Sequence, residues 1–128
     1  MGFYPLLAIG AGASLGAWLR WFFSLWFNPL FFKLPLGTLL ANLVGGYLIG
    51  LAVVWIARNP SLPINLQLFI ITGFLGGLTT FSAFSAETVD LFLRQHYFWA
   101  MIIILVHVLG SLSMTFLGIL TMKSLSSL

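Results

Sequence analysis

Long stretches without a charged side chain limit what this chain can fold into. Residues 34–57, 59–86 and 95–122 contain no Asp, Glu, Lys or Arg. A membrane-spanning helix needs about 20 mostly apolar residues, so the 128-residue chain has room for four spans and no more. The sequence predicts an all-α membrane protein with one four-span domain, its spans at about residues 3–27, 36–57, 66–93 and 97–122.

Composition excludes several other classes of protein. Only 5% of the residues are charged, against about 25% in a soluble domain. The net charge of +3 comes from scattered basic residues and not from a patch, so no nucleic-acid partner is expected. The chain has no cysteine, which removes thiolate chemistry. Residues 1–10 lack the basic region of a removable signal peptide, and we expect a multi-pass protein of the cell (inner) membrane.

Basic residues do not give the spans a clear orientation. Arg58 and Lys123 would flank one side of the membrane, while Lys33, Arg94 and the end of the first span with Arg20 would flank the other. The positive-inside rule therefore specifies orientation only weakly. Two interpretations remain open: something else sets the topology, or the chain inserts both ways and assembles as an antiparallel, dual-topology homodimer.

The third apolar stretch contains residues that are poor choices for a continuous span. Gly73, Gly76 and Gly77 each weaken a helix by about 1 kcal/mol relative to Ala, and Thr79 and Thr80 can bond to nearby backbone. Unpaired backbone groups cannot face lipid, so a break here must line a cavity or be buried in protein. We predict a helix broken near the membrane midplane whose freed carbonyls point at a cation. The alternative is an intact helix whose glycines only allow close packing.

Polar side chains recur at helical spacing near this stretch. Two aromatic rings three residues apart, Phe81 and Phe84, flank Ser82, and their electropositive edges can meet an anion. In the fourth span, His107, Ser111 and Thr115 recur every fourth residue and so share one face. In the second span, Asn42 is an amide that needs a partner or water at this depth; helix–helix contact is its other possible role.

Other residues have plainer interpretations. Arg20 can extend its head group to the interface, or lie at a vestibule where it raises the local anion concentration. Glu87 and Asp90 are interpreted as interfacial. Two pairs of glycines four residues apart predict close helix contacts: Gly12 with Gly16, and Gly46 with Gly50.

Taken together, these motifs resemble the Fluc (CrcB-like) family of fluoride channels. The resemblance covers essentially the whole chain: GxxxR at residues 16–20, NLVGG at 42–46, GFLGGLTTFSAFS at 73–85 and HVLGSLSMT at 107–115. It implies an antiparallel dual-topology dimer with two pores and passive efflux of fluoride. The third-span motif is the specific one, because the first two are short.

The resemblance also implies roles for individual residues. The backbone carbonyls of Gly76 and Thr79 would hold a central structural Na⁺, shared by both subunits. Phe81 and Phe84 would project toward the pores. The remaining fluoride-pathway positions would be Asn42, Ser82, Ser111 and Thr115. Ala83 stands where a hydroxyl residue is common, so no pore role is assigned to it.

Other functions fit the residues less well. A small dual-topology, proton-coupled multidrug antiporter also has four spans, but it needs a buried carboxylate, and this chain has no acidic residue before Glu87. A Ser–His hydrolase would need more than the helical spacing of His107 and Ser111, and no GxSxG motif occurs, so we expect no enzyme. A non-transporting assembly subunit would not need the polar rows. The sequence leaves the role of His107 open.

Overall fold

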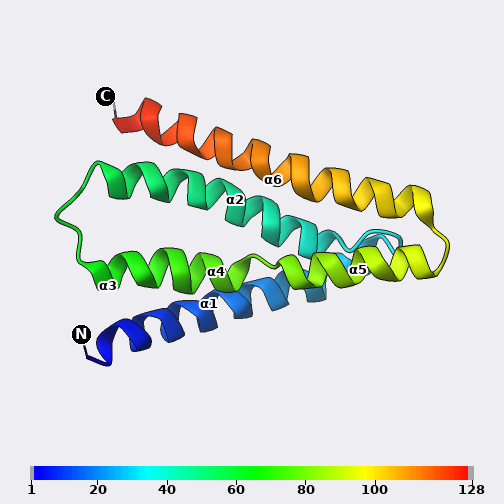
Figure 1. Ribbon diagram of the computed structural model, residues 1–128, viewed down its shortest axis with the longest axis horizontal. Coiled ribbons are helices and arrows are strands. Elements are labelled where there is room, and N and C mark those ends of the chain that lie inside the picture. The colour runs from blue at the N-terminus through cyan, green and yellow to red at the C-terminus, as the bar shows by residue number, and fades with distance from the viewer. Residues whose placement is uncertain (1, 127–128) are drawn as a thin grey trace.

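The prediction of an all-helical chain with four long apolar helices is confirmed. A computed structural model describes residues 2–126, in which all regular structure is helical and four helical segments are long and apolar enough to cross a membrane. They run side by side (Figure 1). The first is α1 (Tyr4–Phe27), continued by a short 3₁₀ turn, η1 (Asn28–Leu30). The others are α2 (Leu36–Ala57), a composite segment over Ile64–Leu93, and α6 (Tyr97–Ser126).

The composite third segment changes conformation along its length. It begins with α3 (Ile64–Gln67), widens into a π-helical stretch, η2 (Leu68–Leu75), and ends its first half with α4 (Gly76–Leu78). Thr79 and Thr80 are then extended, with ψ angles of 153° and 115°, and the thin link between α4 and α5 is visible in Figure 1. The second half is α5 (Phe81–Leu93).

Side-chain caps fix where two of these helices begin. Asn28 Oδ1 accepts hydrogen bonds from the amides of Gly37 and Thr38, at 2.7 and 3.1 Å. The turn after α1 therefore satisfies the first amides of α2, which have no partner within the helix. At the start of α5, Thr80 Oγ1 accepts from the Ala83 amide at 3.1 Å, the usual capping contact of a threonine.

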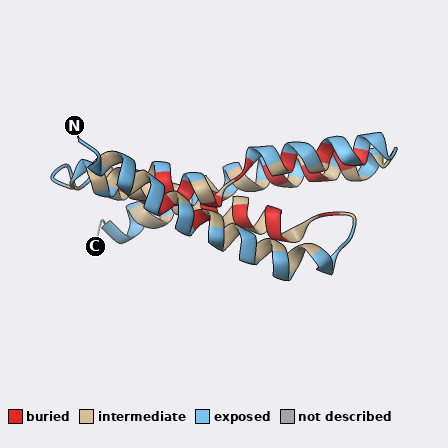
Figure 2. Cartoon of the chain, turned by 90° about the horizontal axis from the view of Figure 1, so that it is seen from below, coloured by how far each residue is buried: buried red, intermediate tan, exposed pale blue. Residues whose placement is uncertain are grey.

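Glycines bring the helices together at two seams, as their spacing predicts. A Cβ added to Gly12 or Gly16 would overlap backbone carbonyl oxygens of Phe69 or Phe74, so α1 packs directly on the third segment. Gly50 and Gly118 form the second seam, where Gly118 Cα lies 3.0 Å from a Cβ added to Gly50. Buried residues gather on the facing sides of the helices, while the outer surface is largely exposed and apolar (Figure 2).

Replacing Gly16 with alanine is expected to lower the stability of the protein. The new Cβ would overlap the Phe74 carbonyl and lie 2.7 Å from the Leu78 amide nitrogen, and such overpacking costs about 1–3 kcal/mol. Gly10→Ala is the matched control on the same helix, because a Cβ there meets nothing within 4 Å. Thermal unfolding in detergent measures both; equal melting temperatures would contradict this packing.

Candidate functional site

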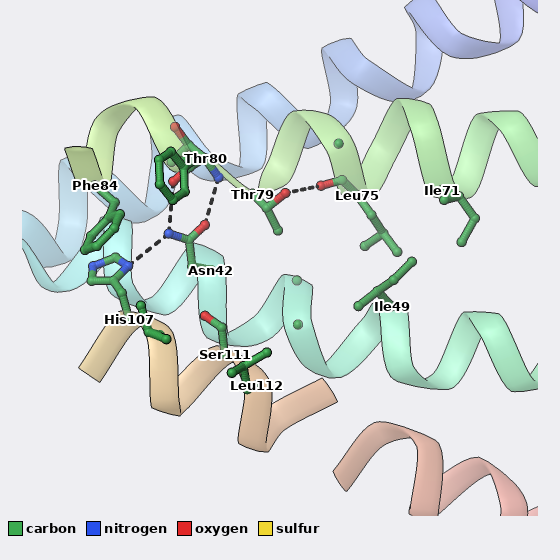
Figure 3. A pocket seen from close by; sticks show the side chains of 15 residues that line it. Asn42, Ile49, Ile71, Leu75, Thr79, Thr80, Phe84, His107, Ser111 and Leu112 are labelled. Atoms are coloured by element: carbon green, nitrogen blue, oxygen red, sulfur yellow. Dashed lines mark hydrogen bonds between the residues drawn. The ribbon is translucent and has the colours of Figure 1, made fainter. Parts of the chain in front are cut away.

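A pocket of about 480 Å³ lies where α2, the interrupted third segment and α6 meet (Figure 3). Every residue that lines it is uncharged or a histidine. The polar lining residues are Asn42, Thr79, Thr80, His107 and Ser111. Its aromatic wall is made by Phe81 and Phe84, and glycines and aliphatic residues form the rest. The pocket therefore carries no permanent charge and offers an ion only dipoles and ring edges.

The amide of Asn42 replaces the helical bonds that are missing at the interruption. Its Oδ1 accepts a hydrogen bond from the Thr80 amide at 2.7 Å, and its Nδ2 donates to the Thr80 carbonyl at 3.0 Å. One side chain thus pairs with both backbone groups of one extended residue (Figure 3). Asn42 holds the third segment in its interrupted form, a contact that the sequence pattern did not reveal.

His107 continues this network on α6. Its Nδ1 lies 3.0 Å from Asn42 Nδ2, and the residue is only 3% exposed. Its other ring nitrogen, Nε2, is buried with no hydrogen-bond partner among residues 2–126. The imidazole packs against Phe84, with ring centroids 4.7 Å apart. The sequence had placed His107 on the polar face of its helix without giving it a role.

The two phenylalanines sit at the start of α5 in an edge-on arrangement. Their ring centroids are 5.5 Å apart and the ring planes meet at 71°. Phe84 is buried, whereas Phe81 is 77% exposed. Phe84 therefore belongs to the interior of this chain, and the outer face of Phe81 is open to whatever lies beside the chain.

The predicted hydroxyl residues do not all reach the pocket. Ser111 lines it, but Ser82 and Thr115 do not. Ser82 is exposed, with its Oγ 3.2 Å from Thr80 Oγ1. Thr115 Oγ1 donates to the Gly46 carbonyl at 2.9 Å, so its hydroxyl forms a hydrogen bond between α6 and α2. The structure thus brings four of the six predicted fluoride-pathway residues together: Asn42, Phe81, Phe84 and Ser111.

Arg20 lies against the interrupted segment. Its Nε donates to the Gly77 carbonyl at 3.0 Å, and the side chain is partly buried. In an unbroken helix that carbonyl would accept from residue 81. Arg20 therefore supplies a donor to one carbonyl at the end of α4, a contact that spacing within α1 could not predict.

The carbonyls of Gly76 and Thr79 lack the amide partners that a continuous helix would supply. Four residues on from Gly76, the Thr80 amide donates to Asn42 instead. Four residues on from Thr79, the Ala83 amide donates to Thr80 Oγ1. Neutral carbonyl oxygens suit a hard cation, and a Cβ added to Gly76 meets only Ile71 O, at 3.7 Å. The chemistry of these carbonyls thus fits a sodium ion.

Glu87, interpreted from the sequence as interfacial, contacts a neighbouring helix. The side chain is partly buried, and its Oε2 accepts a hydrogen bond from Thr38 Oγ1 at 2.7 Å. Its Oε1 is buried with no partner among residues 2–126. Asp90, in contrast, is exposed and pairs with Arg94 at 3.1 Å. Glu87, which contacts α2, and Asp90, which faces outward, are thus about one helical turn apart on α5.

Comparison with known proteins decides the family. The family described as CrcB-like protein, Camphor Resistance (CrcB), matches residues 7–119. The chain belongs to the CrcB-like family. It is 64% identical to the fluoride-specific ion channel FluC of Nitrosospira multiformis over 98% of both chains. It is also 58% identical to the FluC protein of Tolumonas auensis, over 95% of this chain and 96% of that one.

Membership of the CrcB-like family confirms the resemblance that the sequence motifs indicated. The matched residues 7–119 include every residue that lines the pocket. A third relative, the fluoride-specific ion channel FluC of Cupriavidus metallidurans, is 51% identical over 98% of this chain and its own full length. The region matched to the CrcB-like family therefore includes the interruption and its neighbours.

Proposed function

We propose that this protein is a fluoride-selective channel that lets fluoride leave the cell passively. The observation that carries the proposal is the uncharged, donor-bearing pocket at the interruption of the third segment, in a chain whose relatives are named fluoride-specific ion channels. The interruption would lie near the membrane midplane. A helix break at that depth must line a cavity or be buried in protein, and this one borders a pocket.

Fluoride is small and holds its water tightly, so a pathway must replace that water with donors. Ser111 and the rim of Phe81 offer such partners along the pocket, whereas Asn42 lines it with its NH₂ group already bonded to Thr80 and His107. Ring edges carry partial positive charge and attract an anion without trapping it as a buried arginine would. Conduction requires binding that is strong enough for entry and weak enough for exit. Ser82 and Thr115, outside the pocket, would join the pathway only at its ends.

The proposed channel is an antiparallel homodimer with two pores. Support comes from the balanced placement of basic residues at both membrane faces and from Phe81, whose 77% exposed ring borders the pocket. A second copy would complete the wall that one chain leaves open. Cysteines introduced one at a time at either end of α6 and labelled from outside intact cells test this arrangement. Labelling of both ends is expected, and labelling of only one would exclude dual topology.

A structural sodium ion is proposed at the carbonyls of Gly76 and Thr79. When bound, it would supply positive charge to oxygens that have lost their helical partners. The chain's own side chains fix the backbone around these carbonyls. Asn42 keeps Thr80 extended, and Arg20 donates to the carbonyl of Gly77, which lies between Gly76 and Thr79 in the chain. Thermal stability of the protein, compared in lithium, potassium and sodium salts, shows which ion the site prefers. Equal stability in the three salts would rule out the proposed sodium site and leave the proposed channel function in place.

Purified protein in liposomes is expected to release fluoride rapidly and to retain chloride. A fluoride electrode and a chloride electrode, with valinomycin to carry potassium, measure both in parallel. Empty liposomes are the control. Equal release of both anions, or of neither, would overturn the proposed function, and proton-driven efflux of cationic dyes would favour the antiporter.

A further inference from the structure

The hydrogen-bond network at the interruption determines which nitrogen of His107 carries the proton. The Thr80 amide is only a donor, so the Asn42 atom 2.7 Å from it must be the oxygen. The other end of the Asn42 amide is then the NH₂ group, which lies 3.0 Å from the Thr80 carbonyl and 3.0 Å from His107 Nδ1. An amide that could otherwise be placed either way round has one orientation here.

His107 must accept that hydrogen bond. Since Asn42 presents an N–H to Nδ1, the lone pair has to lie on Nδ1 and the proton on Nε2. With a proton on Nδ1, two N–H donors would face each other. The doubly protonated imidazolium, which also carries a proton on Nδ1, is disfavoured for the same reason. The backbone of Thr80, through Asn42, therefore keeps the imidazole neutral with its one N–H at Nε2.

That N–H is left without an acceptor. Nε2 is buried and no partner for it exists among residues 2–126, while the residue as a whole is only 3% exposed and lines the pocket. A buried donor without a partner is costly and native structures rarely keep one. In the proposed channel, the natural acceptor is the anion that passes through the pocket lined by His107.

We infer that His107 Nε2–H is a fixed, neutral hydrogen-bond donor for the permeating anion, a role that rests on the proposed fluoride channel. Phe84 packs on the imidazole with centroids 4.7 Å apart, and both side chains line the pocket. Ser111, one helical turn further along α6, also lines the pocket and would be the next donor. Being neutral, His107 gives fluoride a partner without the strong attraction of a full charge.

Two amide substitutions separate this role from simple support of Asn42. His107→Asn can place its oxygen near the position of Nδ1 and still accept from Asn42, but has no distal donor. His107→Gln carries an amide N–H at the distal position. Fluoride efflux is expected to fall at least about tenfold in His107→Asn, as for loss of a hydrogen bond to a charged partner, and only about threefold or less in His107→Gln. Equal efflux from the two variants, with similar melting temperatures, would overturn the inference.

A spectroscopic test does not depend on flux through a variant of His107. His96→Gln leaves one histidine in the chain, so ¹⁵N-imidazole NMR reports on His107 alone. The proton is expected on Nε2, and added fluoride, but not chloride, is expected to shift that N–H resonance. A proton on Nδ1, or no shift in protein that conducts fluoride, would overturn the inference alone. Liposomes with wild-type protein that pass no fluoride would instead overturn the proposed function, and the assignment of the proton would still stand.

Discussion

Replacing Asn42 with leucine is expected to abolish fluoride efflux. The side chains have similar volume, but leucine can pair with neither the amide nor the carbonyl of Thr80, which Asn42 contacts at 2.7 and 3.0 Å. Each backbone group left unpaired costs about 1–3 kcal/mol, so the interrupted form loses about 3 kcal/mol of stability relative to a continuous helix. The Thr80 amide is then free to return to Gly76, which would close the interruption and the pocket together.

Tyr47→Phe is the matched control for that experiment. It also removes a side-chain hydrogen bond from α2, that of the Tyr47 hydroxyl to Thr121 Oγ1 at 3.0 Å, but neither residue lines the pocket. We expect efflux within about threefold of wild type, since the lost bond joins α2 to α6 away from the interruption. Electrode recordings from proteoliposomes give both rates. Fluoride efflux that survives Asn42→Leu would show that the amide does not hold the pathway open.

Replacing Arg20 with leucine is expected to lower fluoride efflux about tenfold and stability by about 2 kcal/mol. The guanidinium donates to the Gly77 carbonyl at 3.0 Å, and loss of a charged donor from a partly buried acceptor has this magnitude. Gly77 lies between the two carbonyls proposed to bind sodium, so the effect would spread to them. Efflux and thermal unfolding of the same preparation measure the two consequences together.

Arg20→Lys distinguishes this contact from a vestibule role. Lysine keeps the charge but not the guanidinium geometry, so a contact role predicts that it restores neither rate nor stability. A residue that only attracts anions would be replaced well by lysine, and the defect of Arg20→Leu would shrink at high ionic strength. Full recovery with lysine would mean that the Gly77 contact contributes nothing to conduction.

The sequence predicted the features of the fold that depend on residues close together in the chain. Gaps between charges placed the helices, and glycine spacing predicted the contacts of Gly12 and Gly16 with a neighbouring helix. Glycines and threonines in residues 73–80 indicated where the third segment is weak, and two extended residues occur there. Each of these signals comes from local conformational preference or helical periodicity.

Contacts between distant residues could not be predicted in the same way. Arg20 and Gly77 are 57 positions apart, and Asn42 and His107 are 65 apart, so no spacing rule connects them. Periodicity placed His107, Ser111 and Thr115 on one face of α6, but it could not show how close α6 lies to α2. The two helices are close enough for Thr115 to donate a hydrogen bond to the Gly46 carbonyl. The contact of Glu87 could not be predicted for the same reason, since its partner Thr38 belongs to another helix.

In the proposed channel, fluoride alone passes through an uncharged pocket held open by Asn42, without coupling to another ion. The reversal potential across a planar bilayer tests it most directly, with fluoride and chloride gradients set in opposite directions and no pH gradient. We predict a current that reverses at the equilibrium potential of fluoride and disappears in Asn42→Leu. Reversal at the chloride potential, or midway between the two, would contradict the account.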